Sequence, residues 1–223
     1  MIELKNINKT YQVNKNNTVI ALDNINLNIK EGSVVVLKGS SGSGKSTILS
    51  LIAALGKPTS GEVIVDGTHI SKLTDSFSSE FRAKNIGIVF QKYNLIPSLS
   101  VKENVILPLI PSNPDLDDLE VKLEKVLDIF NITDKKDIVV KNLSGGEQQR
   151  VAIARAYVDN PKIIIADEPT ANLDEKLTLR FIEILRGLKQ ESKTIIIATH
   201  DPLFFGLDFV DEEIEIKDGK LVW

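Results

Sequence analysis

The sequence predicts an α/β fold in which a mixed-sheet core carries an antiparallel β part at its N-terminus and an inserted α-helical sub-domain. Three observations lead to this prediction. Apolar and polar residues alternate near the N-terminus, short apolar runs recur later in the chain, and a helix-rich stretch separates two groups of these runs. We expect one domain over residues 1–223. Residues 1–91 and 159–223 would form the α/β core with its antiparallel part, and residues 92–158 the helical sub-domain.

The composition is that of an ordinary globular protein. Of 223 residues, 42% are hydrophobic and 26% are charged, which allows one large core. The formal net charge of -4 argues against nucleic acid as a partner. Cysteine is absent from the sequence, so disulfides and thiolate metal sites are excluded. The apolar stretches fall well short of the ~20 residues that span a bilayer, so we expect any membrane role to come through a partner.

The N-terminal part shows the alternation of half-buried strands. Ile2 and Leu4 alternate with charged residues, and the apolar residues at 25, 27 and 29 alternate with asparagines. This pattern predicts antiparallel strands up to residue 29. Tyr11 lies between the two runs and has two interpretations: a strand residue with a half-buried ring, or an aromatic surface on which a ligand stacks.

A glycine-rich loop follows the apolar run at residues 34–37 and precedes an apolar helical run at residues 48–55. Strand, loop and helix in this order, with the spacing G-x-x-x-x-G-K-[ST], predict a site for the phosphates of a nucleoside triphosphate. Glycines let backbone N–H groups turn toward the phosphates, and the helix N-terminus adds partial positive charge. The Lys45 ammonium would reach the β- and γ-phosphates, and the Ser46 hydroxyl would bind Mg²⁺. The loop consists of Gly39, Ser40, Ser41, Gly42, Ser43, Gly44, Lys45, Ser46 and Thr47.

The next elements lead into the expected helical sub-domain. Residues 86–90 form a compact apolar run that predicts a buried strand ending at Gln91. The Gln91 amide either satisfies backbone groups there or lies beside a metal ion at the carboxyl edge of a parallel sheet. Ser100 and Glu103 have the spacing of a capping box and predict a helix start. The apolar stripe along residues 116–130 has helical spacing and predicts packing rather than a ligand site.

A second informative motif is Leu-Ser-Gly-Gly-Glu-Gln-Gln-Arg at residues 143–150. Ser144 and Glu147 again have capping-box spacing and predict the start of a helix. Gly145 and Gly146 are unfavourable in a helix interior, by about 1 kcal/mol each, which indicates that another group approaches this backbone closely. A helix N-terminus with bare N–H groups and a serine hydroxyl predicts a second anion site.

Two later apolar runs end in residues suited to phosphate chemistry. Residues 163–166 lead into Asp167 and Glu168, and residues 194–199 lead into His200. Beside a phosphate loop, Asp167 would hold Mg²⁺ through water, and Glu168 would polarise the attacking water as a general base. His200 is either structural or a contact to the γ-phosphate.

The remaining elements complete the α/β pattern. Apolar residues at helical spacing predict an amphipathic helix over residues 177–188. The chain closes with a predicted hairpin over residues 213–222, whose turn is Asp218-Gly219.

In this order, the motifs resemble those of the ATP-binding cassette (ABC) ATPases over the whole length of the chain. The motif at residues 143–150 is the specific one, because phosphate loops alone occur in many P-loop families. The resemblance implies the P-loop NTPase ABC-cassette fold, with ATP and Mg²⁺ as cofactors. It also implies a head-to-tail dimer of two copies. Each ATP would lie between the phosphate loop of one copy and the helix start of the other, formed by Ser144, Gly145, Gly146 and Glu147.

The resemblance implies roles for individual residues. Tyr11 would stack on adenine, Gln91 would sense Mg²⁺ and the membrane partner, and Asp174 would link the two active sites across the dimer. The expected catalytic residues are Glu168, His200, Lys45 and Gln91. The expected metal ligands are Ser46, Gln91 and Asp167.

Finer matches resemble the LolD/MacB-type cassettes, which pair with permeases of few transmembrane helices and a large extracytoplasmic domain. These matches lie at residues 81–82, 86–91, 94–97, 103–110 and 167–174. The sequence departs from the common pattern at residues 112–115 and 139–142, both within the expected helical sub-domain.

We therefore expect an ATPase subunit on the cytoplasmic face of a bacterial or archaeal membrane, powering a separate permease of the MacB, LolCE or FtsX type. One alternative is an FtsE-like regulatory ATPase of cell division or the cell wall. Another is a soluble cassette ATPase acting on DNA or ribosomes. That class usually carries coiled-coil inserts or two fused cassettes, which this sequence lacks.

Overall fold

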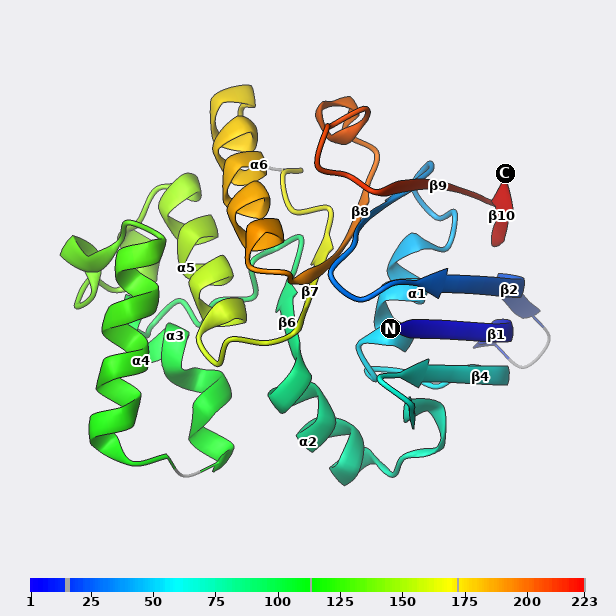
Figure 1. Ribbon diagram of the computed structural model, residues 1–223, viewed down its shortest axis with the longest axis horizontal. Coiled ribbons are helices and arrows are strands. Elements are labelled where there is room, and N and C mark those ends of the chain that lie inside the picture. Colours follow the sequence, from blue (N-terminus) through cyan, green and yellow to red (C-terminus); the bar gives the residue numbers. More distant parts are fainter. Residues whose placement is uncertain (15–16, 113, 172, 223) are drawn as a thin grey trace.

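The computed structural model describes residues 1–14, 17–112, 114–171 and 173–222, and arranges the strands in two sheets with helices around them (Figure 1). The strands are β1 (Ile2–Asn14), β2 (Asn17–Ile29), β3 (Val34–Lys38), β4 (Ser60–Val65), β5 (Thr68–His69), β6 (Ile86–Val89), β7 (Ile163–Asp167), β8 (Thr194–Thr199), β9 (Glu212–Lys217) and β10 (Lys220–Val222). The helices are α1 (Lys45–Ile52), α2 (Asp75–Asn85), α3 (Val101–Ile106), α4 (Leu116–Ile129), α5 (Gly145–Tyr157) and α6 (Glu175–Gln190).

The larger sheet has the order β10-β9-β3-β8-β7-β6, and its five strands from β9 to β6 run parallel. β10 returns antiparallel to β9 through the Asp218-Gly219 turn, where both residues have positive φ (49° and 75°). That geometry is typical of the tight hairpin turn that Asp-Gly favours. The predicted α/β class and the predicted C-terminal hairpin are confirmed.

The smaller sheet has the order β2-β1-β4-β5 and is antiparallel throughout, as the N-terminal alternation predicts. Asparagines fix the irregular pairing of β1 with β2. Asn6 and Asn24 both have left-handed backbone (φ 50° and 52°), which asparagine tolerates better than most residues. The Asn6 N–H donates to the Asn26 side chain and the Asn24 N–H to the Asn8 side chain, both at 2.9 Å. These bonds satisfy backbone groups where the strand register shifts.

The central strands are buried on both faces. Val34 and Val36 of β3 belong to one apolar cluster, with α4, α5 and α6, whereas Val35 and Leu37 belong to another, with α1 and the small sheet. Alternate residues of one strand therefore serve two cores. The carboxyl ends of β3, β7 and β8 lie together at one edge, because these strands are parallel neighbours.

Residues 92–158 contribute α3, α4 and α5, which Figure 1 shows at the opposite end of the molecule from β1 and β2. α3 begins with the predicted capping box: the Ser100 hydroxyl accepts the Glu103 N–H at 3.3 Å, and Glu103 accepts the Ser100 N–H at 2.7 Å. The sub-domain boundaries at 91/92 and 158/159 stay a prediction. In the part of the chain that the structure describes, every helix is too short or too polar to cross a bilayer.

Close packing of β6 against α5 depends on Gly87. A Cβ on Gly87 would lie 2.1 Å from the Ala156 carbonyl oxygen, so Gly87→Ala must push β6 and α5 apart. We expect the free energy of unfolding to fall by about 1–3 kcal/mol, as in other overpacked sites. Urea unfolding measures this change.

The matched control is Gly187→Ala on the exposed side of α6, where a Cβ would meet no atom within 4 Å. Alanine favours a helix interior over glycine by about 0.5–1 kcal/mol, so this variant should be more stable than the wild type. Equal unfolding midpoints for the two variants would contradict the close approach at Gly87.

Candidate functional site

The phosphate loop lies where β3 ends and α1 begins, at the carboxyl edge of the parallel strands. Two of its glycines are required by their surroundings. Gly39 has φ 153°, and a Cβ there would lie 2.3 Å from the Ile216 carbonyl oxygen of β9. Gly44 has φ 112°, and a Cβ there would lie 2.8 Å from the Ala21 carbonyl oxygen. The loop is thus closely held between β2 and the C-terminal hairpin, and it leads directly into the N-terminus of α1.

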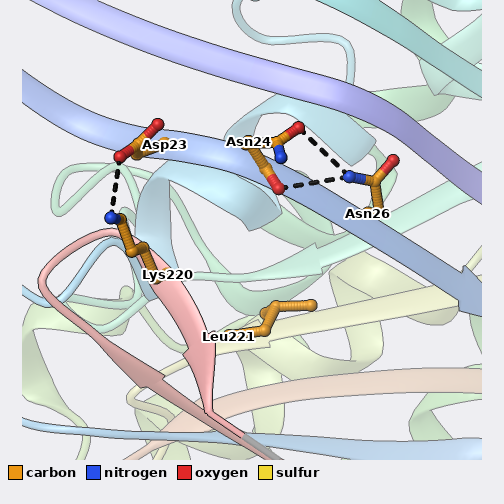
Figure 2. A pocket seen from close by; sticks show the side chains of 5 residues that line it. All are labelled: Asp23, Asn24, Asn26, Lys220 and Leu221. Carbon is orange, nitrogen blue, oxygen red and sulfur yellow. Dashed lines mark hydrogen bonds and ion pairs between the residues drawn. The ribbon is translucent and has the colours of Figure 1, made fainter.

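The same hairpin borders a polar hollow of about 400 Å³ that Figure 2 shows from close by. Lys220 pairs with Asp23 at 3.1 Å, and the Asn26 amide donates to the backbone and side-chain oxygens of Asn24 at 3.2 Å each. The Lys220–Asp23 pair joins β10 to β2, whereas the Asn26–Asn24 bonds lie within β2. The hollow contains none of the predicted site residues.

Lys45 is almost fully buried, with 5% of its side chain exposed. Its ammonium donates to the carbonyl oxygens of Gly39 (2.7 Å) and Ser40 (3.1 Å), and lies 3.3 Å from the Glu168 carboxylate. The side chain therefore crosses the loop and holds its positive charge at the centre of the site.

Ser46 of α1 contacts Asp167 at the end of β7. The Ser46 hydroxyl donates to the Asp167 carboxylate at 2.9 Å, although 121 positions separate them in the sequence. Burial raises the pKa of Asp167 above its ordinary value; the nearby Glu168 carboxylate adds to the rise, while the Ser46 hydroxyl and Lys45 oppose it. A divalent cation bound here would favour the ionised form.

The Ser46 hydroxyl and the Asp167 carboxylate are suitable ligands for Mg²⁺. They are too few for a metal ion that takes all of its ligands from the protein. Within the described ranges, no three His, Cys, Asp or Glu side chains cluster closely enough to hold an ion. Mg²⁺ prefers oxygen ligands and usually takes one or two from the protein, the others coming from water and substrate phosphates. A hydroxyl and a carboxylate beside a phosphate loop supply that kind of partial site.

Glu168 and His200 lie side by side, at the ends of β7 and β8. The Glu168 carboxylate is 2.9 Å from His200 Nδ1, and only 13% of its side chain is exposed, against 65% for His200. Glu168 has φ 44°, a costly backbone conformation, and its N–H donates to the Ala198 carbonyl oxygen at 2.8 Å. The phosphate loop, Asp167, Glu168 and His200 therefore form one group, as the sheet-edge rule predicts.

The helix start at residues 144–147 forms a second group. The Ser144 N–H donates to the Glu147 carboxylate at 2.8 Å, and the Glu147 N–H donates to the Ser144 hydroxyl, which completes the predicted capping box. The Ser144 hydroxyl and N–H together hold the pKa of Glu147 below its usual value. The two glycines differ: a Cβ on Gly146 would lie 2.7 Å from Leu177 of the same chain, whereas a Cβ on Gly145 would meet nothing within 4 Å. Only Gly145 is open to a group from outside the chain.

Asp174 lies next to this second group. Its carboxylate accepts the Leu177 N–H at 2.9 Å and so caps the start of α6, while Leu177 packs on Gly146. The starts of α5 and α6 are therefore in contact.

Tyr11 and Gln91 occupy exposed positions. Tyr11 is 44% exposed on β1, and the Lys9 ammonium lies 4.8 Å from its ring centroid. Gln91 directly follows β6.

One residue near Gln91 escaped the sequence-based prediction. The half-buried Arg155 guanidinium donates to the carbonyl oxygens of Tyr93 and Asn94, each at 2.6 Å, and both of those residues have positive φ. Burial lowers the pKa of Arg155. It holds the loop after Gln91 against α5. Its position on the buried side of a predicted helix was the only signal in the sequence.

Comparisons with known proteins agree with this geometry. A family model described as "ABC transporter" matches residues 22–171. An uncharacterized ABC transporter ATP-binding protein of Methanocaldococcus jannaschii, MJ1508, is 42% identical over 222 residues, covering all of this chain and 98% of that protein. The macrolide export ATP-binding/permease protein MacB of Campylobacter jejuni is 39% identical over 222 residues, which cover this whole chain but 34% of MacB.

A solved structure extends the likeness to the fold. The dimeric post-hydrolysis state of the ATP-binding cassette MJ0796, bound to ADP and Pi, superposes with a TM-score of 0.91 at 41% identity, covering 100% of this chain and 97% of that one. A match of this extent includes both sheets and the helical stretch. The chain therefore belongs to the ABC transporter family and is one of its ATP-binding cassette ATPases.

Proposed function

We propose that the phosphate loop, Ser46, Asp167, Glu168 and His200 form the site at which this ATPase cleaves ATP. Two contacts at the carboxyl edge of the large sheet support this proposal: Ser46 with Asp167 at 2.9 Å, and Lys45 with Glu168 at 3.3 Å. They bring a phosphate-binding cation, two oxygen ligands for Mg²⁺ and a general base to one point.

In this proposal the Lys45 ammonium and the α1 N-terminus bind the β- and γ-phosphates. Ser46 and Asp167, together with Gln91, would hold Mg²⁺, which when bound would neutralise charge on the phosphate oxygens. Glu168 accepts a proton from the water that attacks the γ-phosphorus, and the bond to the ADP oxygen breaks. His200 contacts the γ-phosphate while its Nδ1 stays bonded to Glu168. Tyr11, which is 44% exposed, stacks on adenine.

We also propose that two copies enclose ATP between them, head to tail. The solved MJ0796 structures are described as dimeric. In this chain Ser144, the open Gly145 and the N-terminus of α5 form a second anion site. Glu147 holds Ser144 in place, and Asp174 lies beside the same surface, where it would link the two sites.

A groove next to Gln91 offers a surface for a membrane permease. It has a volume of about 810 Å³ and runs between α2, β6 and the end of α5, with Ala83 and Phe90 in its apolar wall. Arg82, Lys84 and Asp159 supply charge at its lining. A mostly apolar groove with a few charged groups suits one helix or loop of a partner. We propose that a permease of the MacB, LolCE or FtsX type docks here, which would place the chain at the cytoplasmic face of the membrane.

The test is a pull-down from detergent-solubilised native membranes with tagged Glu168→Gln protein, with and without ATP, read by mass spectrometry. We expect a permease with a large extracytoplasmic domain. Adding Ala83→Glu places a carboxylate in the groove and should reduce its recovery at least about tenfold. The matched control is Val121→Glu, at a position on α4 that is 66% exposed and does not line the groove.

Recovery of a different kind of permease would leave the ATPase role intact but contradict the subfamily. Recovery of only cell-division or cell-wall proteins would favour the FtsE-like role. If no membrane protein is recovered, the permease proposal is wrong. Equal losses from Ala83→Glu and Val121→Glu would place the docking surface elsewhere.

A further inference from the structure

Two short segments place Glu168 beside His200. One is Glu168-Pro169-Thr170 after β7, and the other is Thr199-His200-Asp201 at the end of β8. The Glu168–His200 contact at 2.9 Å is the first bond between them. The Glu168 N–H also donates to the Ala198 carbonyl oxygen of β8 at 2.8 Å, so both of these bonds involve Glu168 itself.

A second bond joins the same segments, and its donor is buried. The Thr170 hydroxyl donates to one carboxylate oxygen of Asp201 at 3.0 Å, and Thr170 is only 4% exposed. The other Asp201 oxygen accepts the Leu203 N–H at 3.0 Å. The Asp201 N–H donates to the hydroxyl of Thr199, which is fully buried. These three bonds hold Asp201 through both carboxylate oxygens and its N–H. The Thr170 bond therefore ties the segment after β7 to a fixed carboxylate. Hydrogen bonds to a carboxylate are among the stronger ones in proteins.

The residue between Glu168 and Thr170 is held from a third direction. The Gln149 side chain of α5, 4% exposed, donates to the Pro169 carbonyl oxygen at 2.9 Å. Three successive residues therefore have three different anchors: His200, α5 and Asp201.

We propose that Thr170 is a positioning residue for ATP cleavage: its buried bond to Asp201 sets the distance between Glu168 and His200, with Gln149 bracing the same segment. This inference rests on the roles proposed above for Glu168 and His200. Thr170 binds no nucleotide, so its loss should leave ATP affinity unchanged and slow the chemical step. A displacement of a reacting group by about 1 Å can lower a rate by about a hundredfold, and the remaining anchors limit the effect here.

Steady-state ATP hydrolysis tests this. For Thr170→Val, which removes the donor but keeps the shape, we expect kcat to fall about tenfold while KM for ATP stays within about twofold. Thr170→Ser keeps the hydroxyl and should retain at least about half of the wild-type kcat. The matched control is Thr194→Val at the opposite end of β8, where an equally buried hydroxyl accepts the Gly32 N–H at 2.9 Å. That variant should melt at a lower temperature with an unchanged kcat.

A second pair of variants tests the bond itself. Asp201→Asn keeps the shape but removes the charge, and should lower kcat about threefold. In the double variant with Thr170→Val the losses should not multiply, since both remove one interaction. If Thr170→Val fails to fold, the kcat of Asp201→Asn tests the positioning role by itself.

The outcomes separate the two levels of the proposal. If the wild type hydrolyses ATP and Thr170→Val is fully active, the positioning role of Thr170 is wrong, while the proposed site for ATP cleavage stands. An equal loss of kcat in Thr194→Val also overturns the positioning role, because the effect would then follow general destabilisation. A wild type that binds ATP but does not hydrolyse it, as a dimer with Mg²⁺, contradicts the proposed site itself.

Discussion

Glu168→Gln is expected to lower ATP turnover at least about a hundredfold while leaving ATP binding intact. Glutamine has the same size and keeps an oxygen acceptor for His200, but its amide cannot accept a proton from water. A well-placed general base contributes about 10²–10⁴ in rate. The low exposure of Glu168, 13%, means that bulk water replaces it poorly. Phosphate release under saturating Mg-ATP measures the loss.

The same variant should accumulate with ATP bound, and therefore as a dimer. Gel filtration with Mg-ATP, with nucleotide content measured in each peak, detects this species. The control is Glu183→Gln, an exposed residue on α6 that is 70% accessible and pairs with Arg186. It should match the wild type in turnover and in elution. Turnover of Glu168→Gln within a few-fold of the wild type would rule out Glu168 as the base. A monomer alone in Mg-ATP would contradict the site shared between two copies.

Lys45→Ala is expected to weaken ATP binding about a hundredfold and to abolish measurable turnover. Each bond from an ammonium to a charged oxygen contributes about 1.5–3 kcal/mol, and Lys45 is the buried cation of the loop. Its removal also takes the hydrogen-bond donor from the Gly39 and Ser40 carbonyls, so the loop should lose its shape. Equilibrium titration with a fluorescent ATP analogue measures the affinity.

Lys102→Ala is the control for this variant. Lys102 pairs with Asp137 on the surface, where both side chains are well exposed, and such pairs contribute about 0–1 kcal/mol. Its ATP affinity should be unchanged. Near-normal hydrolysis by Lys45→Ala would contradict the phosphate-loop interpretation.

The two predictions differ in which step they stop. Without Lys45 the chain should bind ATP about a hundredfold more weakly, so few pairs of copies have a ligand to share. Without the Glu168 carboxylate the chain should hold ATP but not release phosphate. A nucleotide-dependent dimer in one variant and its absence in the other would therefore order binding, closure and cleavage.

Local rules were sufficient for much of the fold. Both capping boxes, at Ser100 and Ser144, depend on residues three positions apart, and both are formed. The helix after the phosphate loop was less well predicted at its end. The apolar run suggests a helix up to residue 55, but α1 ends at Ile52, and Ala54 has a left-handed backbone that gives no signal in an Ala-Ala-Leu sequence.

The central site could also be predicted, for a topological reason. Ser46 and Asp167 are far apart in the sequence, yet Ser46 lies in the helix that follows β3 and Asp167 ends β7, and parallel strands bring their carboxyl ends together. The bonds of Gln149 to Pro169 and of Thr170 to Asp201 follow no such rule. They depend on how α5 and two loops pack, and a buried threonine or glutamine has many possible partners in a sequence.

The contact between Gly146 and Leu177 has an evolutionary consequence. Leu177 fills the space that glycine leaves at position 146, thirty-one positions earlier. The sizes of these two residues therefore constrain each other during evolution. A lineage that acquires a larger residue at 146 must first shorten the residue at 177, and the order of the two changes matters. Homologous recombination between relatives would succeed more often when its crossover points leave residues 146 and 177 with the same parent.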